Sequence, residues 1–135
     1  MELNTALTIS ARGMDAQTTR LRVIAENLAN QDTTGSTPGG TPYRRKTITF
    51  GNQVEQALGA STVKVKQVGR DNTEFPLRYD PGHPAADKNG YIRAPNVNSF
   101  IEVMDMREAE RSYAANLAVM QVSRSMLTRT VEMLK

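Results

Sequence analysis

Apolar residues recur at heptad spacing at both ends of this 135-residue chain, and this pattern constrains the fold most. From Leu3 to about Asn30 there is no proline and one glycine, and the spacing alternates between four and three without a break. The positions of this seam are Leu3, Leu7, Ser10, Met14, Gln17, Leu21, Ile24 and Leu28. The segment is therefore predicted to form a helix with one narrow apolar stripe.

The same signal returns from about Asn98 to Leu134, where an apolar residue stands at every seventh position. These residues are Met106, Tyr113, Met120, Leu127 and Leu134. Three residues before them stand Val103, Glu110, Leu117, Arg124 and Val131. The polar pair Glu110 and Arg124 is predicted to fix the register and the choice of partner at a cost in stability. Ser99 and Glu102 predict a capping box at the start of this helix.

The middle of the chain, residues 31–97, has a different character and holds nearly all the prolines and glycines. Alternating side chains predict strands over residues 43–50 and 62–68, and shorter strands over 77–79 and 91–93. We therefore expect an α+β fold with three parts. These are an N-terminal helix over 1–30, a loop and β-rich middle domain over 31–97, and a C-terminal helix over 98–135.

The two predicted helices would be about 40 and 55 Å long, which is much larger than the radius of gyration of a compact chain of this length, about 14 Å. An elongated subunit with antiparallel helices in a coiled-coil-like pair is expected. Aromatic residues make up only 5% of the chain and tryptophan is absent, so the core is small. The apolar seams are predicted to be completed by partner molecules.

Little in the sequence supports catalysis or ligand binding. The chain has no cysteine, and its single histidine, His83, has no second soft ligand beside it, although Asp80 and Asp87 are near in sequence. A turn histidine is the better interpretation of His83, and the carboxylates of Asp105, Glu108 and Glu110 are best interpreted as a solvated or ion-paired helix face. No enzyme activity, cofactor, metal site or small-molecule substrate is predicted.

Two basic clusters, Arg44-Arg45-Lys46 and Lys64 with Lys66, are the densest positive regions. They lack an aromatic platform for nucleic acid, so ion pairs between subunits are the preferred interpretation. The formal charge is +3, which is too small for a nucleic-acid footprint. The N-terminus has no basic region followed by an apolar stretch, and no segment is apolar enough for a membrane span. If the protein leaves the cytoplasm, it is therefore expected to do so without a cleavable signal peptide.

Several motifs resemble the flagellar rod and hook axial protein family. The segment from Ile24 to Asn30, IAENLAN, is similar to the signature of the whole family, and PYRRK at 42–46, YDPGHP at 79–84 and PNVN at 95–98 resemble its proximal-rod members. The residues that carry the resemblance are Asn27, Asn30, Tyr43, Asp80, Pro81, Gly82, His83, Asn89, Gly90, Tyr91, Asn96, Asn98, Arg111 and Asn116.

This resemblance implies a structural subunit of the proximal rod of the bacterial flagellar basal body, in the periplasmic space, exported by the flagellar type III apparatus. It implies that the helices form an axial domain and that the middle forms an outer domain. The implied partners are copies of the chain itself, other proximal-rod proteins, and the base of the rod near the membrane ring and the export gate. The rod would act as drive shaft and export channel in motility.

The residues expected to contact neighbouring subunits are the large apolar members of the two seams. They are Leu3, Leu7, Met14, Leu21, Ile24, Leu28, Met106, Tyr113, Leu117, Met120, Leu127, Val131 and Leu134. The alternative function is a soluble helical binding module, such as an export adaptor. Such a module would be a stable monomer or closed dimer, whereas a rod subunit requires partners.

Overall fold

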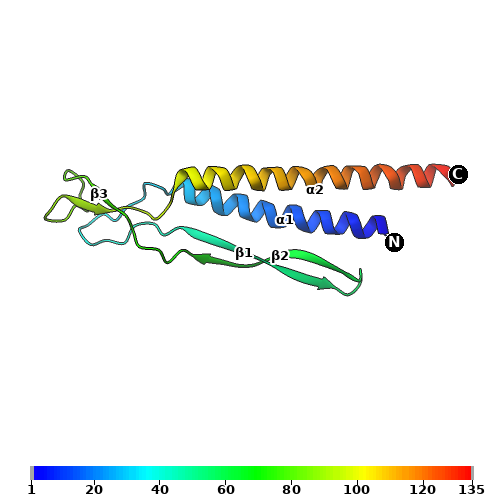
Figure 1. Ribbon diagram of the computed structural model, residues 1–135, viewed down its shortest axis with the longest axis horizontal. Coiled ribbons are helices and arrows are strands. Elements are labelled where there is room, and N and C mark those ends of the chain that lie inside the picture. The colour runs from blue at the N-terminus through cyan, green and yellow to red at the C-terminus, as the bar shows by residue number, and fades with distance from the viewer. Residues whose placement is uncertain (1, 135) are drawn as a thin grey trace. The chain divides into compact units, whose positions relative to one another are not determined.

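The computed structural model describes residues 2–134 and contains two long helices and four strands (Figure 1). In chain order they are α1 (Glu2–Ala29), β1 (Lys46–Glu55), β2 (Ala60–Arg70), β3 (Leu77–Tyr79), β4 (Tyr91–Arg93) and α2 (Ser99–Met133). The predicted α+β class, with helices at both ends and a β-containing insert, is confirmed.

The strands form two separate two-stranded sheets. The β1–β2 hairpin turns at residues 56–59, where Gly59 has a φ of 60°, a left-handed conformation that favours glycine. In the second sheet β3 and β4 pair antiparallel, with Leu77 opposite Arg93 and Tyr79 opposite Tyr91. The two short strands begin and end where the sequence predicted. The first long strand begins three residues later than predicted and continues to Glu55.

The chain divides into two compact units, and each long helix contributes a part to both. The first unit consists of Met1–Leu21, Ile48–Gln67 and Met106–Lys135. The second consists of residues 22–47 and 68–105. The predicted division into residues 1–30, 31–97 and 98–135 stays a prediction.

In the first unit α1 and α2 run antiparallel and meet through small side chains (Figure 1). A Cβ atom on Gly13 would lie 2.9 Å from the side-chain amide of Asn116, and Arg20 lies 3.3 Å from Glu108. The most buried side chains of the two helices in this unit are Ser10, Ala16, Ala109 and Ser123. Short side chains let the two backbones approach closely, so this contact buries little apolar surface.

The side of α2 that contacts α1 is not the side on which the predicted companion residues lie. Three residues after Met106 and Met120 stand Ala109 and Ser123, which are buried, and three residues after Tyr113 stands Asn116, which is half-buried beside Gly13. The predicted companions three residues earlier, including Leu117 and Val131, are exposed. The companion positions are therefore not part of the contact within the subunit, and their contact with partner molecules stays a prediction. The predicted positions were chosen for their large apolar side chains, whereas the close approach of the two helices requires small ones.

We predict that enlarging Ala109 destabilises the first unit. Ala109 is fully enclosed, so Ala109→Leu should lower the free energy of unfolding by about 1–3 kcal/mol through overpacking. The matched control is Ala118→Leu on the exposed face of the same helix, which should change it by less than about 0.5 kcal/mol. Urea denaturation followed by circular dichroism measures both, and equal destabilisation would contradict the predicted helix contact.

The second unit has a small apolar core of its own. Val23 and Ile24 near the end of α1, Ala85, and Ile92 of β4 are its buried apolar side chains. Two fully enclosed polar side chains, Asn27 and Glu102, lie in the same unit. Because buried polar groups are stable only when they are hydrogen-bonded, their partners define how this unit is held together.

Candidate assembly surfaces and the Asn27 network

The side-chain amide of Asn27 makes four hydrogen bonds and is 1% exposed. Its Nδ2 donates to the carbonyl of Lys46 at 2.9 Å and to Oε2 of Glu102 at 3.2 Å. Its Oδ1 accepts from the hydroxyl of Tyr43 and from the backbone N–H of Lys46, both at 2.9 Å. An amide can donate twice and accept twice, so Asn27 is fully used. It joins the end of α1, the segment before β1, and the first turn of α2.

Glu102 is the buried charge of this network and is 0% exposed. The Nε of Arg45 donates to its Oε1 in a charge-assisted hydrogen bond. The guanidinium of Arg45 also lies 3.6 Å from Asp71 and 3.8 Å from Asp105. A carboxylate removed from water is tolerated only when it is paired in this way, so Glu102 fixes the position of Arg45.

Asn96 is a second amide hub, in the segment before α2. Its Oδ1 accepts the backbone N–H of Arg45 at 2.8 Å, and its Nδ2 lies within hydrogen-bond distance of the carbonyl of Asp71, at 3.1 Å, and of Thr73. Asn27 precedes Arg45 and Lys46 in the sequence and Asn96 follows them, and both side chains hold this short stretch of chain in place.

The helix α2 is capped by Asn98 and not by the predicted capping box. The Oδ1 of Asn98 accepts the backbone N–H groups of Phe100, at 3.1 Å, and Ile101, at 3.4 Å. The predicted start of the helix is confirmed, but the predicted capping pair is wrong because Glu102 turns inward to Arg45 and Asn27.

The basic cluster Arg44-Arg45-Lys46 is paired within the chain. Arg44 stacks on the ring of Phe75, 4.3 Å from its centre, and Lys46 forms an ion pair with Glu26. The chain therefore supplies partners for all three cations, and their pairing with other subunits stays a prediction. Lys64 and Lys66 on β2 are exposed and form no ion pair within residues 2–134.

His83 lies in a turn, as predicted. Its Nδ1 accepts the backbone N–H of Ala85 at 3.0 Å, so its Nε2 carries the proton and donates to the hydroxyl of Thr34 at 3.0 Å. The rest of the motif, Asp80, Pro81, Gly82, Asn89, Gly90 and Tyr91, forms the connection between β3 and β4 and the first residue of β4. Gly90 has a φ of 82° and packs against the ring of Tyr79.

The other motif residues lie on the helices. Asn30 donates to the carbonyl of Glu26 at 2.8 Å, and Asn116 donates to that of Ser112 at 3.0 Å beside Gly13. Arg111 is exposed on α2. Sequence reasoning singled out Asn27 and Asn96 by resemblance alone and did not find their role as hydrogen-bond hubs.

The residues predicted to contact other subunits fall into three groups. Ile24 is buried in the second unit. Half-buried members are Leu3, Leu7, Met14, Leu21, Leu28, Met106, Tyr113, Met120 and Leu127. Leu117, Val131 and Leu134 are exposed, and so are the predicted register residues Glu110 and Arg124. The structure also exposes Phe100, Met104 and Val122 on α2, which the predicted list of contacts omits.

Alkaline pH is predicted to weaken the Asn27 network through Tyr43. Burial raises the pKa of Tyr43 above its ordinary value of about 10, since phenolate is disfavoured away from water. Its stabilising contribution is complete below that pH and is lost as the pH rises through the folded-state pKa. The hydrogen bond to Glu26 raises the pKa of Lys46, so Lys46 acts in the same direction.

Thermal unfolding above about pH 10 tests this prediction. The melting temperature of the wild-type chain should fall more steeply with pH than that of Tyr43→Phe, which has no phenol to ionise. Tyr79→Phe, at an exposed position, is the matched control and should follow the wild type. Equal slopes for Tyr43→Phe and the wild type would contradict the role given to Tyr43.

Neither a metal-binding cluster nor a membrane-spanning helix is present among the described residues. They contain no cluster of three or more histidine, cysteine, aspartate or glutamate side chains suited to a metal ion. None of their helices has both the length and the apolar character needed to cross a bilayer.

Comparison with known proteins points to one family. Residues 7–36 match the family described as flagella basal body rod protein, and residues 88–133 match the C-terminal family of flagellar basal body rod FlgEFG proteins. The chain is 50% identical to the flagellar basal-body rod protein FlgC of Agrobacterium fabrum, over 98% of this chain and 96% of that protein. It is 41% identical to FlgC of Salmonella typhimurium, over 97% of both chains. With FlgC of Aquifex aeolicus the identity is 40%, over 98% of this chain and 97% of that protein.

Proposed function

Because the chain belongs to the FlgC family of flagellar basal-body rod proteins, we propose that it builds the rod through the exposed faces of its two long helices. Family membership makes it a structural subunit of the proximal rod. The observation that supports the proposed use of the helices is the number of large apolar side chains left uncovered along α2 and at Leu134, four within residues 100–104 and seven within 117–134. Eleven large apolar side chains between Phe100 and Leu134 are exposed.

Exposed apolar side chains do not stabilise a monomer, and where many occur together they mark sites of protein contact. The α1–α2 contact is closed by small side chains, so Leu117, Val131 and Leu134 remain available to neighbours. Glu110 and Arg124 interrupt this row, and we assign them the choice of register between subunits. Repeated contacts between two different surfaces of one chain generate a helical tube.

The proposed neighbours are copies of this chain, other proximal-rod proteins, and the base of the rod near the membrane ring and the export gate. The proposed location is the part of the rod in the periplasmic space, reached by type III export without a cleavable signal peptide. Residues 1–30 and 98–135 would form the axial domain, and residues 31–97 the outer domain. The motifs of the family support these assignments.

The family is a structural one, and we propose that this chain has no catalytic activity and needs no cofactor. His83 supports this view, because both of its ring nitrogens are engaged in holding a turn. The alternative, a soluble binding module, has the weaker support, since a module that works alone would not leave most of α2 uncovered.

Deletion of the gene in its own bacterium tests the proposed function. Electron microscopy of isolated basal bodies should show membrane rings without a rod, and the wild-type gene on a plasmid should restore the rod and motility. Complete rods in the deletion strain would overturn the proposal. Catalytic turnover that is lost in a His83→Ala variant would overturn the assignment of a purely structural role.

A further inference from the structure

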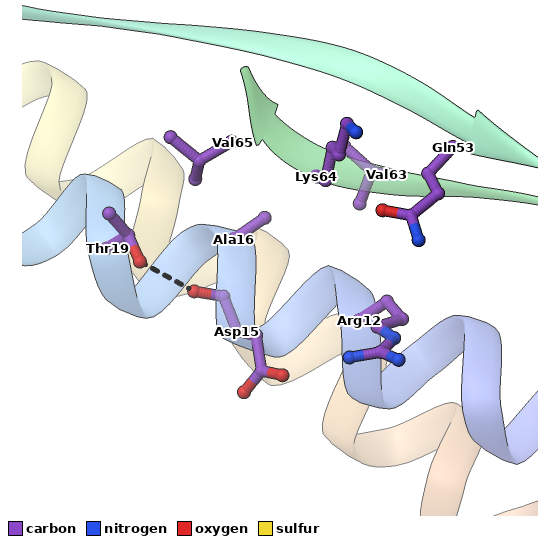
Figure 2. Close-up of a pocket in the computed structure, with 8 residues that line it drawn as sticks. All are labelled: Arg12, Asp15, Ala16, Thr19, Gln53, Val63, Lys64 and Val65. Carbon is purple, nitrogen blue, oxygen red and sulfur yellow. Dashed lines mark hydrogen bonds between the residues drawn. The ribbon is translucent and has the colours of Figure 1, made fainter. Parts of the chain in front are cut away.

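A small slot lies in the first unit between α1 and the β1–β2 hairpin (Figure 2). Its volume is about 180 Å³, and Ala16 of α1 faces Val63 and Val65 of β2 across it. Cavities of about 150 Å³ bind benzene, so this slot can take one large aliphatic side chain. The slot is therefore a hole of the right size for a single apolar knob.

One positive charge beside the slot has no ion-pair partner within the described residues. Arg12 is paired with Glu55 at 2.9 Å, and the carboxylate of Asp15 points away from the strands (Figure 2). Lys64 also lines the slot and is exposed; its amino group points away from α1 in Figure 2 and has no ion-pair partner in the described part of the chain. An occupant with an acidic group beside its apolar knob would complement this charge.

The end of α2 has this chemistry. Met133 is 80% exposed, Leu134 is 83% exposed and Val131 is 55% exposed, so three apolar side chains are uncovered within four positions. Glu132 stands among them and forms no ion pair within residues 2–134. The last turn of α2 has no basic side chain. The partial negative charge of a helix C-terminus adds to that of Glu132, so this end of the helix attracts a cation.

The reason for the exposure lies in the lengths of the two helices. Gly13 lies against Asn116, and Arg20 lies against Glu108. Continued along the antiparallel pair, this register places the start of α1 beside about residue 127 of α2, so the last six helical residues extend about 9 Å beyond α1. We call residues 128–134 the overhang.

The overhang cannot reach the slot of its own chain. The slot lies beside residues 12–19 of α1, which are opposite about residues 110–117 of α2. Met133 is therefore about 24 Å farther along the helix axis. Only another molecule can bring the end of α2 into the slot.

We propose that the overhang of one copy docks in the slot of a second copy, with Met133 or Leu134 on Ala16 and Val63 and with Glu132 beside Lys64. The inference rests on the proposed function and deepens it, because it names two surfaces of the chain that meet. The two surfaces are different, so each copy has a free slot and a free overhang after one contact has formed. Such a head-to-tail contact continues along an assembly instead of closing a dimer.

Disulfide cross-linking in assembled rods tests the proposal. The wild-type chain has no cysteine, so Val63→Cys with Met133→Cys introduces the only two thiols of the subunit. Basal bodies from a strain that expresses this variant are oxidised and separated without reductant. We expect a ladder of dimers, trimers and longer products. Co-expression of the two single variants should stop at the dimer.

The matched control is Val54→Cys with Met133→Cys, because Val54 is exposed on the same hairpin but does not line the slot. This control should give no ladder. Subunits recovered in rods without the Val63–Met133 disulfide would overturn the slot contact and leave the rod function intact. Dimers of Met133→Cys alone would overturn it too, since they would show two overhangs meeting. Absence of the wild-type subunit from basal bodies would instead overturn the proposed function.

Charge reversal gives a second measurement that needs no cysteine. Lys64→Glu and Glu132→Lys should each lower the number of complete rods about two- to fivefold, the range of one exposed ion pair. The double variant should recover the loss, whereas Lys66→Glu, outside the slot, should have little effect. A double variant no better than the single ones would contradict the pairing of Lys64 with Glu132.

Discussion

Asn27→Ala is expected to lower the free energy of unfolding of the second unit by about 3–5 kcal/mol, which is a large part of the stability of a small domain. The side chain satisfies four buried or half-buried partners at once. Its removal leaves the N–H and C=O of Lys46 unpaired, takes one donor from Glu102, and opens a cavity. Each unsatisfied buried group costs about 1–3 kcal/mol.

Equilibrium urea unfolding measures the global effect, and hydrogen exchange at the Lys46 amide measures the local one. Asn30→Ala is the matched control, because Asn30 bonds only its own turn and the loop that follows. It should cost less than about 1 kcal/mol. If the two alanine variants unfold at the same urea concentration, Asn27 does not hold the unit as described.

Removal of the overhang is expected to abolish rod assembly while leaving the subunit folded. A chain that ends at residue 127 loses Val131, Met133 and Leu134, none of which has a covering side chain of α1 beside it. The melting temperature should change little because surface residues contribute little to stability. Rods and motility should be lost because the uncovered apolar side chains are where partners are proposed to bind.

Two full-length variants test whether rod assembly needs the apolar side chains of the overhang or only its length. Val131→Ser with Leu134→Ser should also block assembly. Thr128→Ala with Thr130→Ala is the control, because both hydroxyls bond carbonyls of their own helix, at 3.1 and 2.9 Å. Motility in a strain that carries only the truncated chain would contradict the role given to this end of α2.

The helices and strands depend mainly on local sequence, and they could be predicted from it. Heptad spacing and the absence of proline set the two helices, and turn residues bounded the strands, so the short strands were placed to the residue. The phase of α2 against α1 could not be read from apolar residues, since the contact selects Ala109 and Ser123 for their size. Among the described residues, Gln17 shows the cost of a polar side chain in such a seam, because its Oε1 is buried without a hydrogen-bond partner.

The Asn27 network could not be predicted from the sequence for a different reason. Asn27, Arg45 and Glu102 are far apart in the sequence, and each is ordinarily a surface residue type. Glu102 fitted a capping box, and only the inward turn of its side chain shows that Asn98 does the capping instead. Glu102 stands seven residues before Ala109 and twenty-one before Ser123, so all three lie on the same side of α2. This spacing was the signal that could have predicted a buried Glu102.

The amide of Asn27 also acts as a substitute for a neighbouring strand. The carbonyl of Arg45 bonds Asp71 on the side of β2, so the N–H and C=O of Lys46 point to the opposite side, where β1 has no strand beside it. Asn27 occupies both of these groups. Unpaired strand edges recruit strands from other chains and lead to aggregation. A single side chain of a helix thus closes the start of this edge against pairing with the strands of other molecules.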